Sequence, residues 1–188
     1  KMKNKGVTRA HLIATEACRA AQNGVQFLTR VSDELGLALE VIDRETEARL
    51  AATGCTPLID PQADGAILFD IGGGSSELVR LARSQKGRGG PPLPQIRGWI
   101  SVPHGVVTLA ERHGGITVTR ESYEAMVSEV AALIAPFVRE HSTEATTGFH
   151  MLGTSGTVTT IAGVHLNLRR YDRNRVDGCW MSAPQIDA

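Results

Sequence analysis

The 188-residue sequence is poor in several features, and each scarcity excludes a class of protein. It has only three cysteines, Cys18, Cys55 and Cys179, and no CxxC spacing, which argues against a disulfide framework, a structural zinc site and a redox pair. Its six histidines lack the HxxxH and HExxH spacings of metal sites, so we assign them no role. The formal net charge is zero, so an anion site must be built locally and not by a global field.

Long apolar runs and aromatic residues are also scarce. No apolar run reaches the roughly 18 residues of a membrane span, and the opening segment KMKNKGVTRA lacks an apolar signal core. We therefore expect a soluble, cytoplasmic protein with no membrane partner. The basic segment from Arg80 to Arg97 contains no aromatic residue, so it is either a solvated loop or a polyanion contact, and we predict no nucleic-acid polymer as a partner.

The first third of the chain has the pattern of two βα units. We predict strands over 7–15 and 37–42, and helices over 16–22, 23–35 and 44–54. Asn23 and Asp43 are the expected N-caps, and Gly36 the expected stop signal. In the third helix Ala48, Leu50 and Ala51 are expected to pack inward. The turn-rich segment 61–65 (PQADG) predicts a lobe boundary.

The remainder of the chain alternates short strands with helices. We predict a hairpin of strands over 66–71 and 75–82, a third strand over 96–103 and a short helix over 106–114. An amphipathic helix over 121–139 follows, bent or ended by Pro136. A strand over 149–152, a turn and a helix over 158–168 complete the order.

Three consecutive glycines stand in the stretch FDIGGGSSEL, directly after an apolar strand. Each glycine costs backbone entropy on folding, so the run is expected where the backbone must do what a side chain forbids. The run has neither the GxGxxG spacing of a dinucleotide fold nor the lysine of a P-loop. Its N–H groups, with the hydroxyls of Ser75 and Ser76, predict an anion site. The alternative is an ordinary hairpin turn.

Carboxylates flank this turn, and a second glycine turn follows later. Asp70 and Glu77 both lie at the base of the first turn, where a hard cation such as Mg²⁺ takes carboxylate ligands. The alternatives are that Asp70 caps the turn and Glu77 is a solvated strand residue. The second turn, GTSGT, opens a helix, where a phosphate meets free N–H groups and the helix dipole. The two turns fit either a clamp on a multi-phosphate ligand or two ordinary turns.

Four segments, ATEACRAAQNGVQFL, VIDRETEARLAATG, ILFDIGGGSSEL and LGTSGTVTTIAG, in this order and at these separations, closely resemble the exopolyphosphatase / guanosine pentaphosphate phosphohydrolase (Ppx/GppA) family. The resemblance covers nearly the whole chain. It implies an α/β fold of the actin-like ATPase (acetate kinase/sugar kinase/Hsp70) superfamily, with two ribonuclease-H-like lobes and the substrate between them. It also implies a magnesium-dependent hydrolase of the stringent response. Its expected reaction releases terminal phosphate from inorganic polyphosphate or the 5′ phosphate from guanosine pentaphosphate.

The resemblance assigns roles to individual residues. Glu47 matches the catalytic glutamate that activates water, although Thr46 replaces the acid often found before it. Asp70 matches the residue tied to the divalent metal, and Glu77 matches a further acidic residue of that metal site. The phosphate-binding set that the resemblance implies is Arg19, Gly72, Gly73, Gly74, Ser75, Gly153, Thr154, Ser155, Gly156 and Thr157.

One departure from the family pattern shapes the expected domain organisation. The family begins with a strand–turn of the D-x-G-S-N-S type, which this sequence lacks. We therefore expect a fragment: residues 1–62 as the second half of the N-terminal lobe, and 63–188 as a second lobe that is incomplete at its C-terminus. Such a fragment is expected to be inactive alone and to form homodimers through unpaired strand edges. The alternative function is a non-hydrolytic actin-like module that binds guanosine tetra- or pentaphosphate.

Overall fold

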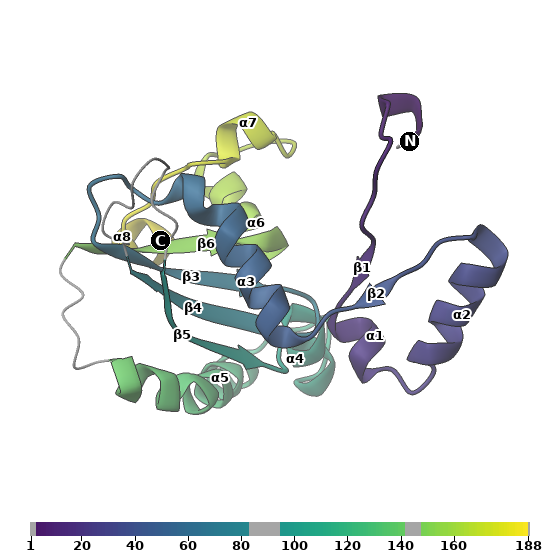
Figure 1. Cartoon of the computed structure of the whole chain (residues 1–188). Helices are drawn as coiled ribbons and strands as arrows, with labels where there is room; N and C mark the ends of the chain where they lie inside the picture. The colour runs from purple at the N-terminus through teal and green to yellow at the C-terminus, as the bar shows by residue number, and fades with distance from the viewer. Residues whose placement is uncertain (1–2, 83–94, 142–147, 188) are drawn as a thin grey trace. The chain divides into compact units, whose positions relative to one another are not determined.

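The computed structural model describes residues 3–82, 95–141 and 148–187 (Figure 1). The chain divides into two compact units, residues 1–47 and 48–188, and the division falls inside helix α3 (Arg44–Cys55). The predicted boundary between the two ribonuclease-H-like lobes, after residue 62, is not tested by this division into units. It stays a prediction. No helix in the described parts of the chain is long and apolar enough to cross a membrane.

The first unit contains a short parallel βαβ arrangement. Strand β1 (Ile13–Ala14) pairs in parallel with β2 (Glu40–Val41), and helices α1 (Glu16–Ala20) and α2 (Gly24–Leu35) connect them. A 3₁₀ turn, η1 (Lys3–Lys5), precedes β1. The predicted strand over 7–15 is wrong except at its end, because a two-residue partner strand offers hydrogen bonds to only a few residues of β1.

The helix signals of this region are only partly realised. Gly36 ends α2 in the left-handed conformation, with φ of 64°, as predicted. Asn23 is the N-cap residue of α2, as predicted, but its side chain makes no capping bond. Asp43 does cap α3: its Oδ1 accepts from the Thr46 N–H at 2.7 Å. Leu50 is 51% exposed, against prediction, because it lies about 200° around the helix from the buried Ala48.

The second unit is built on a four-stranded sheet in the order β5-β4-β3-β6. Its strands are β3 (Gly65–Ile71), β4 (Ser76–Ala82), β5 (Gln95–Val102) and β6 (Phe149–Thr154). The three strands β3, β4 and β5 form an antiparallel meander, and β6 joins β3 in parallel. The predicted hairpin, the third strand over 96–103 and the strand over 149–152 are confirmed.

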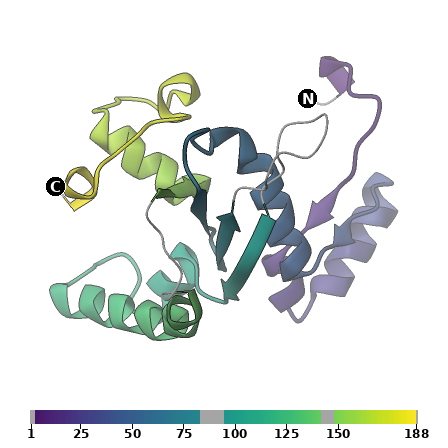
Figure 2. The ribbon, with the colours of Figure 1, turned by 60° about the vertical axis from the view of Figure 1, so that its left-hand side comes forward.

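Helices cover both faces of this sheet, as Figure 2 shows. On one face Ala48 and Ala52 of α3 pack against Leu68, Val79 and Leu81, which are fully buried. The opposite face carries α5 (Arg120–His141) and α6 (Ser155–His165); α5 passes through Pro136 without ending there. The smaller elements of the unit are η2 (Thr56–Leu58), α4 (Val106–Arg112), α7 (Arg173–Val176) and α8 (Ala183–Asp187).

Candidate active site

The glycine loop joins β3 to β4 and presents backbone donors. The Gly72 N–H donates to the Ser75 carbonyl at 3.0 Å, so this donor is taken. The Gly72 and Gly73 carbonyls accept, at 3.0 Å each, from the first two N–H groups of α4. The N–H groups of Gly73, Gly74 and Ser75 donate to no backbone group of the described residues. The loop therefore holds three N–H groups that are available to a ligand.

Neither backbone conformation nor packing requires glycine at position 73. Neither Gly72 nor Gly73 has a φ in the left-handed region. A Cβ added at Gly73 would meet only the Val107 side chain, at an ordinary 3.5 Å. No described residue excludes a side chain there, which leaves close approach of a ligand to the backbone as the remaining reason.

The second glycine motif is a direct passage from strand to helix. Strand β6 runs through Gly153 and Thr154, and α6 begins at Ser155. A Cβ at Gly153 would lie 2.6 Å from the Phe69 ring, so this glycine is required by packing. Ser155 has a φ of 73°, a left-handed conformation that a side chain disfavours. Thr154 makes no side-chain capping bond, so the first N–H groups of α6 remain without a cap.

The two glycine motifs border one cavity of about 630 Å³. Gly72 and Gly73 line it from the end of β3, and Ser155, Gly156 and Thr157 line it from the start of α6. The Thr157 hydroxyl also reaches the Ile71 carbonyl, at 3.5 Å. The structure thus brings together the two loops that the sequence singled out separately.

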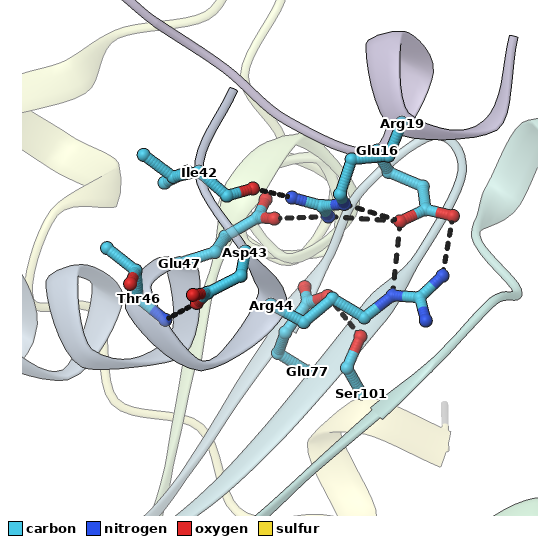
Figure 3. A network of polar contacts seen from close by, with 9 residues as sticks. All are labelled: Glu16, Arg19, Ile42, Asp43, Arg44, Thr46, Glu47, Glu77 and Ser101. Atoms are coloured by element: carbon cyan, nitrogen blue, oxygen red, sulfur yellow. Dashed lines mark hydrogen bonds and ion pairs between the residues drawn. The ribbon is translucent and has the colours of Figure 1, made fainter. Parts of the chain in front are cut away.

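The two predicted metal ligands are direct neighbours across the sheet. Asp70 on β3 is paired in register with Glu77 on β4, and their outer neighbours in the same row are Thr154 on β6 and Ser101 on β5. Residues in register point to the same face, so the four side chains form a polar row. Glu77 is buried, with 4% exposure, and its Oε1 accepts from the Ser101 hydroxyl at 2.9 Å (Figure 3).

This polar row and the cavity use opposite faces of the sheet. Ile71 lines the cavity, and the preceding residue, Asp70, therefore points to the other face. That face also carries Cys55 of α3. Burial raises the pKa of the Cys55 thiol, with a further rise from the Asp70 charge and an opposing effect from the Thr154 hydroxyl. The glycine loop joins the ends of the two central strands, β3 and β4.

Glu47 and Arg19 belong to the first unit and contact each other there. The Arg19 Nη2 donates to the Glu47 Oε2 at 2.7 Å, and the two side chains are 17% and 23% exposed. Arg19 also donates to the Ile42 carbonyl at 2.6 Å and to Glu16 at 3.0 Å (Figure 3). The guanidinium thus holds one oxygen of Glu47, whose Oε1 accepts no bond from a described residue.

Glu16 extends this network to Arg44. Its carboxylate accepts two bonds from the Arg44 guanidinium, at 2.9 and 3.2 Å, in addition to those from Arg19. The bond from Arg44 lowers the pKa of Glu16, burial opposes it, and Arg19 adds to the lowering. Burial also opposes the charge of Arg19, but the hydrogen bonds to Glu47 and Glu16 outweigh it and raise the pKa of Arg19. The network therefore favours the charged forms of Glu16 and Arg19.

The donor chemistry of the polar row fits a hard divalent cation. Two carboxylates from adjacent strands are a common protein share of a Mg²⁺ shell, with water and phosphate oxygens completing it. Within the described ranges, no three His, Cys, Asp or Glu side chains gather into a metal site. These residues therefore do not form a Mg²⁺ site made of protein ligands alone.

Sequence reasoning missed the residues that support the glycine loop. The Ser76 hydroxyl, predicted as a ligand donor, instead donates to the His104 carbonyl at 2.7 Å. Gly105 follows, and a Cβ there would lie 2.4 Å from the Gly72 carbonyl oxygen. The available sequence signal was the pair His104–Gly105 directly before a predicted helix. A single histidine and glycine do not indicate a contact with the glycine loop. The rest of the basic segment, residues 83–94, lies outside the described residues.

Comparison with known proteins identifies what the chain is similar to. The model of the Ppx/GppA phosphatase family matches residues 2–174. Among solved structures, the Aquifex aeolicus PPX-GPPA enzyme is 28% identical to this chain, with a TM-score of 0.66. The match covers 93% of this chain and 52% of the Aquifex chain. An exopolyphosphatase-like protein is 29% identical with a TM-score of 0.75, covering 92% and 53%.

A third structure supports the fold alone. The exopolyphosphatase from Cytophaga hutchinsonii is 23% identical with a TM-score of 0.73, covering 88% of this chain and 50% of its own. The chain thus spans about half the length of the solved structures it matches.

Proposed function

Because the chain belongs to the Ppx/GppA phosphatase family, which is part of the actin-like ATPase superfamily, we propose that the protein hydrolyses phosphoanhydride bonds. Its substrates are inorganic polyphosphate, from which it releases terminal phosphate, or guanosine pentaphosphate, from which it releases the 5′ phosphate. The observation that carries this proposal is the glycine loop, with three N–H groups free of backbone partners among the described residues.

The loop supplies what phosphoryl transfer chiefly asks of a protein. Charge spreads over the phosphoryl oxygens in the transition state, and donors that are already oriented stabilise it without reorganisation. In our proposal the N–H groups of Gly73, Gly74 and Ser75 bind these oxygens. The uncapped start of α6, at Ser155 to Thr157, binds a neighbouring phosphate of the same substrate.

Asp70 and Glu77 are the residues that would hold Mg²⁺. A bound Mg²⁺ would neutralise charge on the substrate phosphates. Asp70 would present its carboxylate from the end of β3, next to the glycine loop. The Ser101 hydroxyl, at 2.9 Å from Oε1, would keep the buried Glu77 carboxylate oriented.

Glu47 is the proposed general base. One carboxylate oxygen is held by Arg19 at 2.7 Å, which fixes the orientation of the group, and Oε1 is left to take a proton from the attacking water. The family resemblance predicts Arg19 as a phosphate ligand. Because its guanidinium donates hydrogen bonds to Glu47, Glu16 and the Ile42 carbonyl, we propose instead that Arg19 orients the base.

We also propose the cellular setting and assembly that the sequence suggested. The protein acts in the cytoplasm, in the stringent response, as a homodimer. Support for self-association comes from the sheet of the second unit, where the outer edges of β5 and β6 pair with no further strand of the described residues. Sedimentation of the purified protein tests the dimer.

The decisive experiment measures phosphate release by the full-length gene product with Mg²⁺. We expect release from polyphosphate, from guanosine pentaphosphate or from both, and loss of release when the metal is chelated. Binding of either compound without any release would contradict the proposal and favour the non-hydrolytic module. Adenosine triphosphate serves as the control anhydride, because it carries a phosphate chain without belonging to either proposed substrate class.

A further inference from the structure

A single carboxylate, that of Glu129 on α5, holds both ends of the short helix α4. Its Oε1 contacts the His104 Nε2 at 2.6 Å, two residues before the helix begins. Its Oε2 contacts the His113 Nε2 at 2.7 Å, directly after the helix ends, and Arg112 pairs with Oε1. Three cationic or potentially cationic groups from the α4 segment thus meet one anion on α5.

The N-terminal end of α4 determines how the glycine loop is oriented. The N–H groups of Val106 and Val107 donate to the carbonyls of Gly72 and Gly73, at 3.0 Å each. In a planar trans peptide the carbonyl of one residue and the N–H of the next point in opposite directions. Anchoring these two carbonyls to α4 therefore turns the N–H groups of Gly73 and Gly74 away from α4.

The contact between helix and loop leaves little room for adjustment. Gly105 packs so closely that an added Cβ would lie 2.4 Å from the Gly72 carbonyl oxygen. The His104 carbonyl accepts from the Ser76 hydroxyl at 2.7 Å, which ties the same segment to the start of β4. His104 is 7% exposed. A displacement of α4 is therefore passed directly to the loop.

We propose that Glu129 is a positioning residue for phosphate binding: by holding His104 and His113 it fixes α4, and α4 fixes the direction of the N–H donors of the glycine loop. This inference rests on the proposed function, because it assigns those N–H groups to substrate phosphate. Glu129 itself does not touch the loop. Its effect is carried by α4.

The test compares Glu129→Gln with Glu124→Gln in the full-length gene product. Glu124 is an exposed residue of the same helix whose side chain makes no hydrogen bond or ion pair with the described residues, so its variant controls for the lost charge. Inorganic tripolyphosphate is the binding probe, measured by calorimetry. We expect Glu129→Gln to weaken its binding roughly 10- to 100-fold, the usual worth of hydrogen bonds to a charged group. Glu124→Gln should bind as the unchanged protein does.

Kinetics separate positioning from a general loss of structure. For whichever substrate is hydrolysed, Glu129→Gln should raise KM and change kcat much less, because the groups that act on water are untouched. Glu129→Asp, which keeps the charge, should recover part of the loss. Equal tripolyphosphate binding by the Glu129→Gln and Glu124→Gln variants would overturn the inference, and so would a fall in kcat alone.

The binding readout keeps this inference distinct from the proposed function. If neither substrate is hydrolysed but tripolyphosphate binds and Glu129→Gln weakens it, the hydrolase proposal fails and the positioning role stands. Should Glu129→Gln be unfolded by circular dichroism, His113→Gln gives the same test. It removes one arm of the clamp at the end of α4 that is farther from the loop. A folded His113→Gln that binds tripolyphosphate normally would then overturn the inference.

Discussion

At the scale of single residues, Gly73 is a position where glycine is explained by ligand binding and not by folding. Its φ is outside the left-handed region, and a Cβ would meet only Val107, at 3.5 Å. Folding therefore has no need of glycine there. Glycine nevertheless costs conformational entropy, which indicates that the bare backbone serves a ligand.

Gly73→Ala should accordingly raise stability and weaken binding. We expect the free energy of unfolding to rise by about 0.4–1 kcal/mol, because alanine restricts the unfolded chain. Tripolyphosphate binding should fall roughly tenfold or more, since the methyl group occupies the approach to the N–H donors. Urea denaturation and calorimetry measure the two effects. Gly54→Ala, at a helix position with open space, is the control that should gain stability and keep binding.

Glu47→Gln tests the proposed base. The amide keeps the shape of the side chain but cannot accept the proton, so kcat should fall by roughly 10²–10⁴ with little change in KM. Steady-state phosphate release from the full-length gene product is the measurement. The control is Glu45→Gln, at an exposed position in the same turn of α3, which should leave kcat unchanged. Normal turnover in the Glu47 variant would remove this residue from the mechanism.

At the scale of elements, the passage from β6 to α6 stores backbone strain at Ser155. The residue opens the helix with a φ of 73°, and no glycine relieves that position. A left-handed conformation costs an L-residue roughly 1–2 kcal/mol.

Ser155→Gly should therefore stabilise the protein relative to Ser155→Ala by about 1 kcal/mol, because both variants lose the hydroxyl and only glycine removes the strain. The difference in urea midpoint between the two variants measures it. Equal midpoints would show that the junction is not strained.

The contact between α4 and α5 predicts a specific response to acid. The hydrogen bond from His113 lowers the pKa of Glu129 to about 2, burial opposes it, and His104 and Arg112 add to the lowering. The ordinary value is 4.5. A lowered folded-state pKa stabilises the protein fully above the ordinary value, and this contribution is lost as the pH falls through about 2.

The free energy of unfolding should thus differ between the unchanged protein and Glu129→Gln by an amount that shrinks from about pH 5 to about pH 2. Urea titrations at several pH values measure the difference. A difference that stays constant down to pH 2 would contradict the assigned pKa.

How far the sequence predicts these elements depends on whether their signals are local. The hairpin of β3 and β4 was predictable because an apolar run, a glycine turn and a second apolar run lie within 18 residues, 65–82. The strand over 7–15 was overpredicted because its length depends on β2, which has two residues. His104 and Glu129 are 25 residues apart, and neither carries a spacing that indicates the other.

The candidate site shows the same limit. The glycine motifs and the Asp70–Glu77 pair could be chosen from sequence, since they lie at the ends of apolar strands. The capture of Gly72's N–H by Ser75 and the pairing of Arg19 with Glu47 could not. Both contacts depend on which polar groups the folded chain brings within hydrogen-bond distance of each other. A sequence motif does not contain that information.

At the scale of the whole molecule, the predicted family and mixed α/β class are confirmed by the family match over residues 2–174. The two units differ greatly in the apolar surface that they bury. Ile42 is the main buried hydrophobic residue of the first unit in its described residues, whereas Leu68, Val79 and Leu81 anchor a larger core in the second. A two-stranded sheet of two residue pairs adds little to the first unit.

This asymmetry predicts two levels of protection in amide hydrogen exchange of the 188-residue chain. Amides of β3 and β4 should exchange only through global unfolding, because their hydrogen bonds lie beneath α3 and beside paired strands. Amides that join β1 and β2, those of Glu40 and of Ile42 directly after β2, should exchange through local opening, at least 10²-fold faster, which corresponds to about 2.7 kcal/mol less protection. Exchange followed by mass spectrometry or NMR at neutral pH measures both sets. Equal protection of the two sheets would show that the units unfold as one cooperative body.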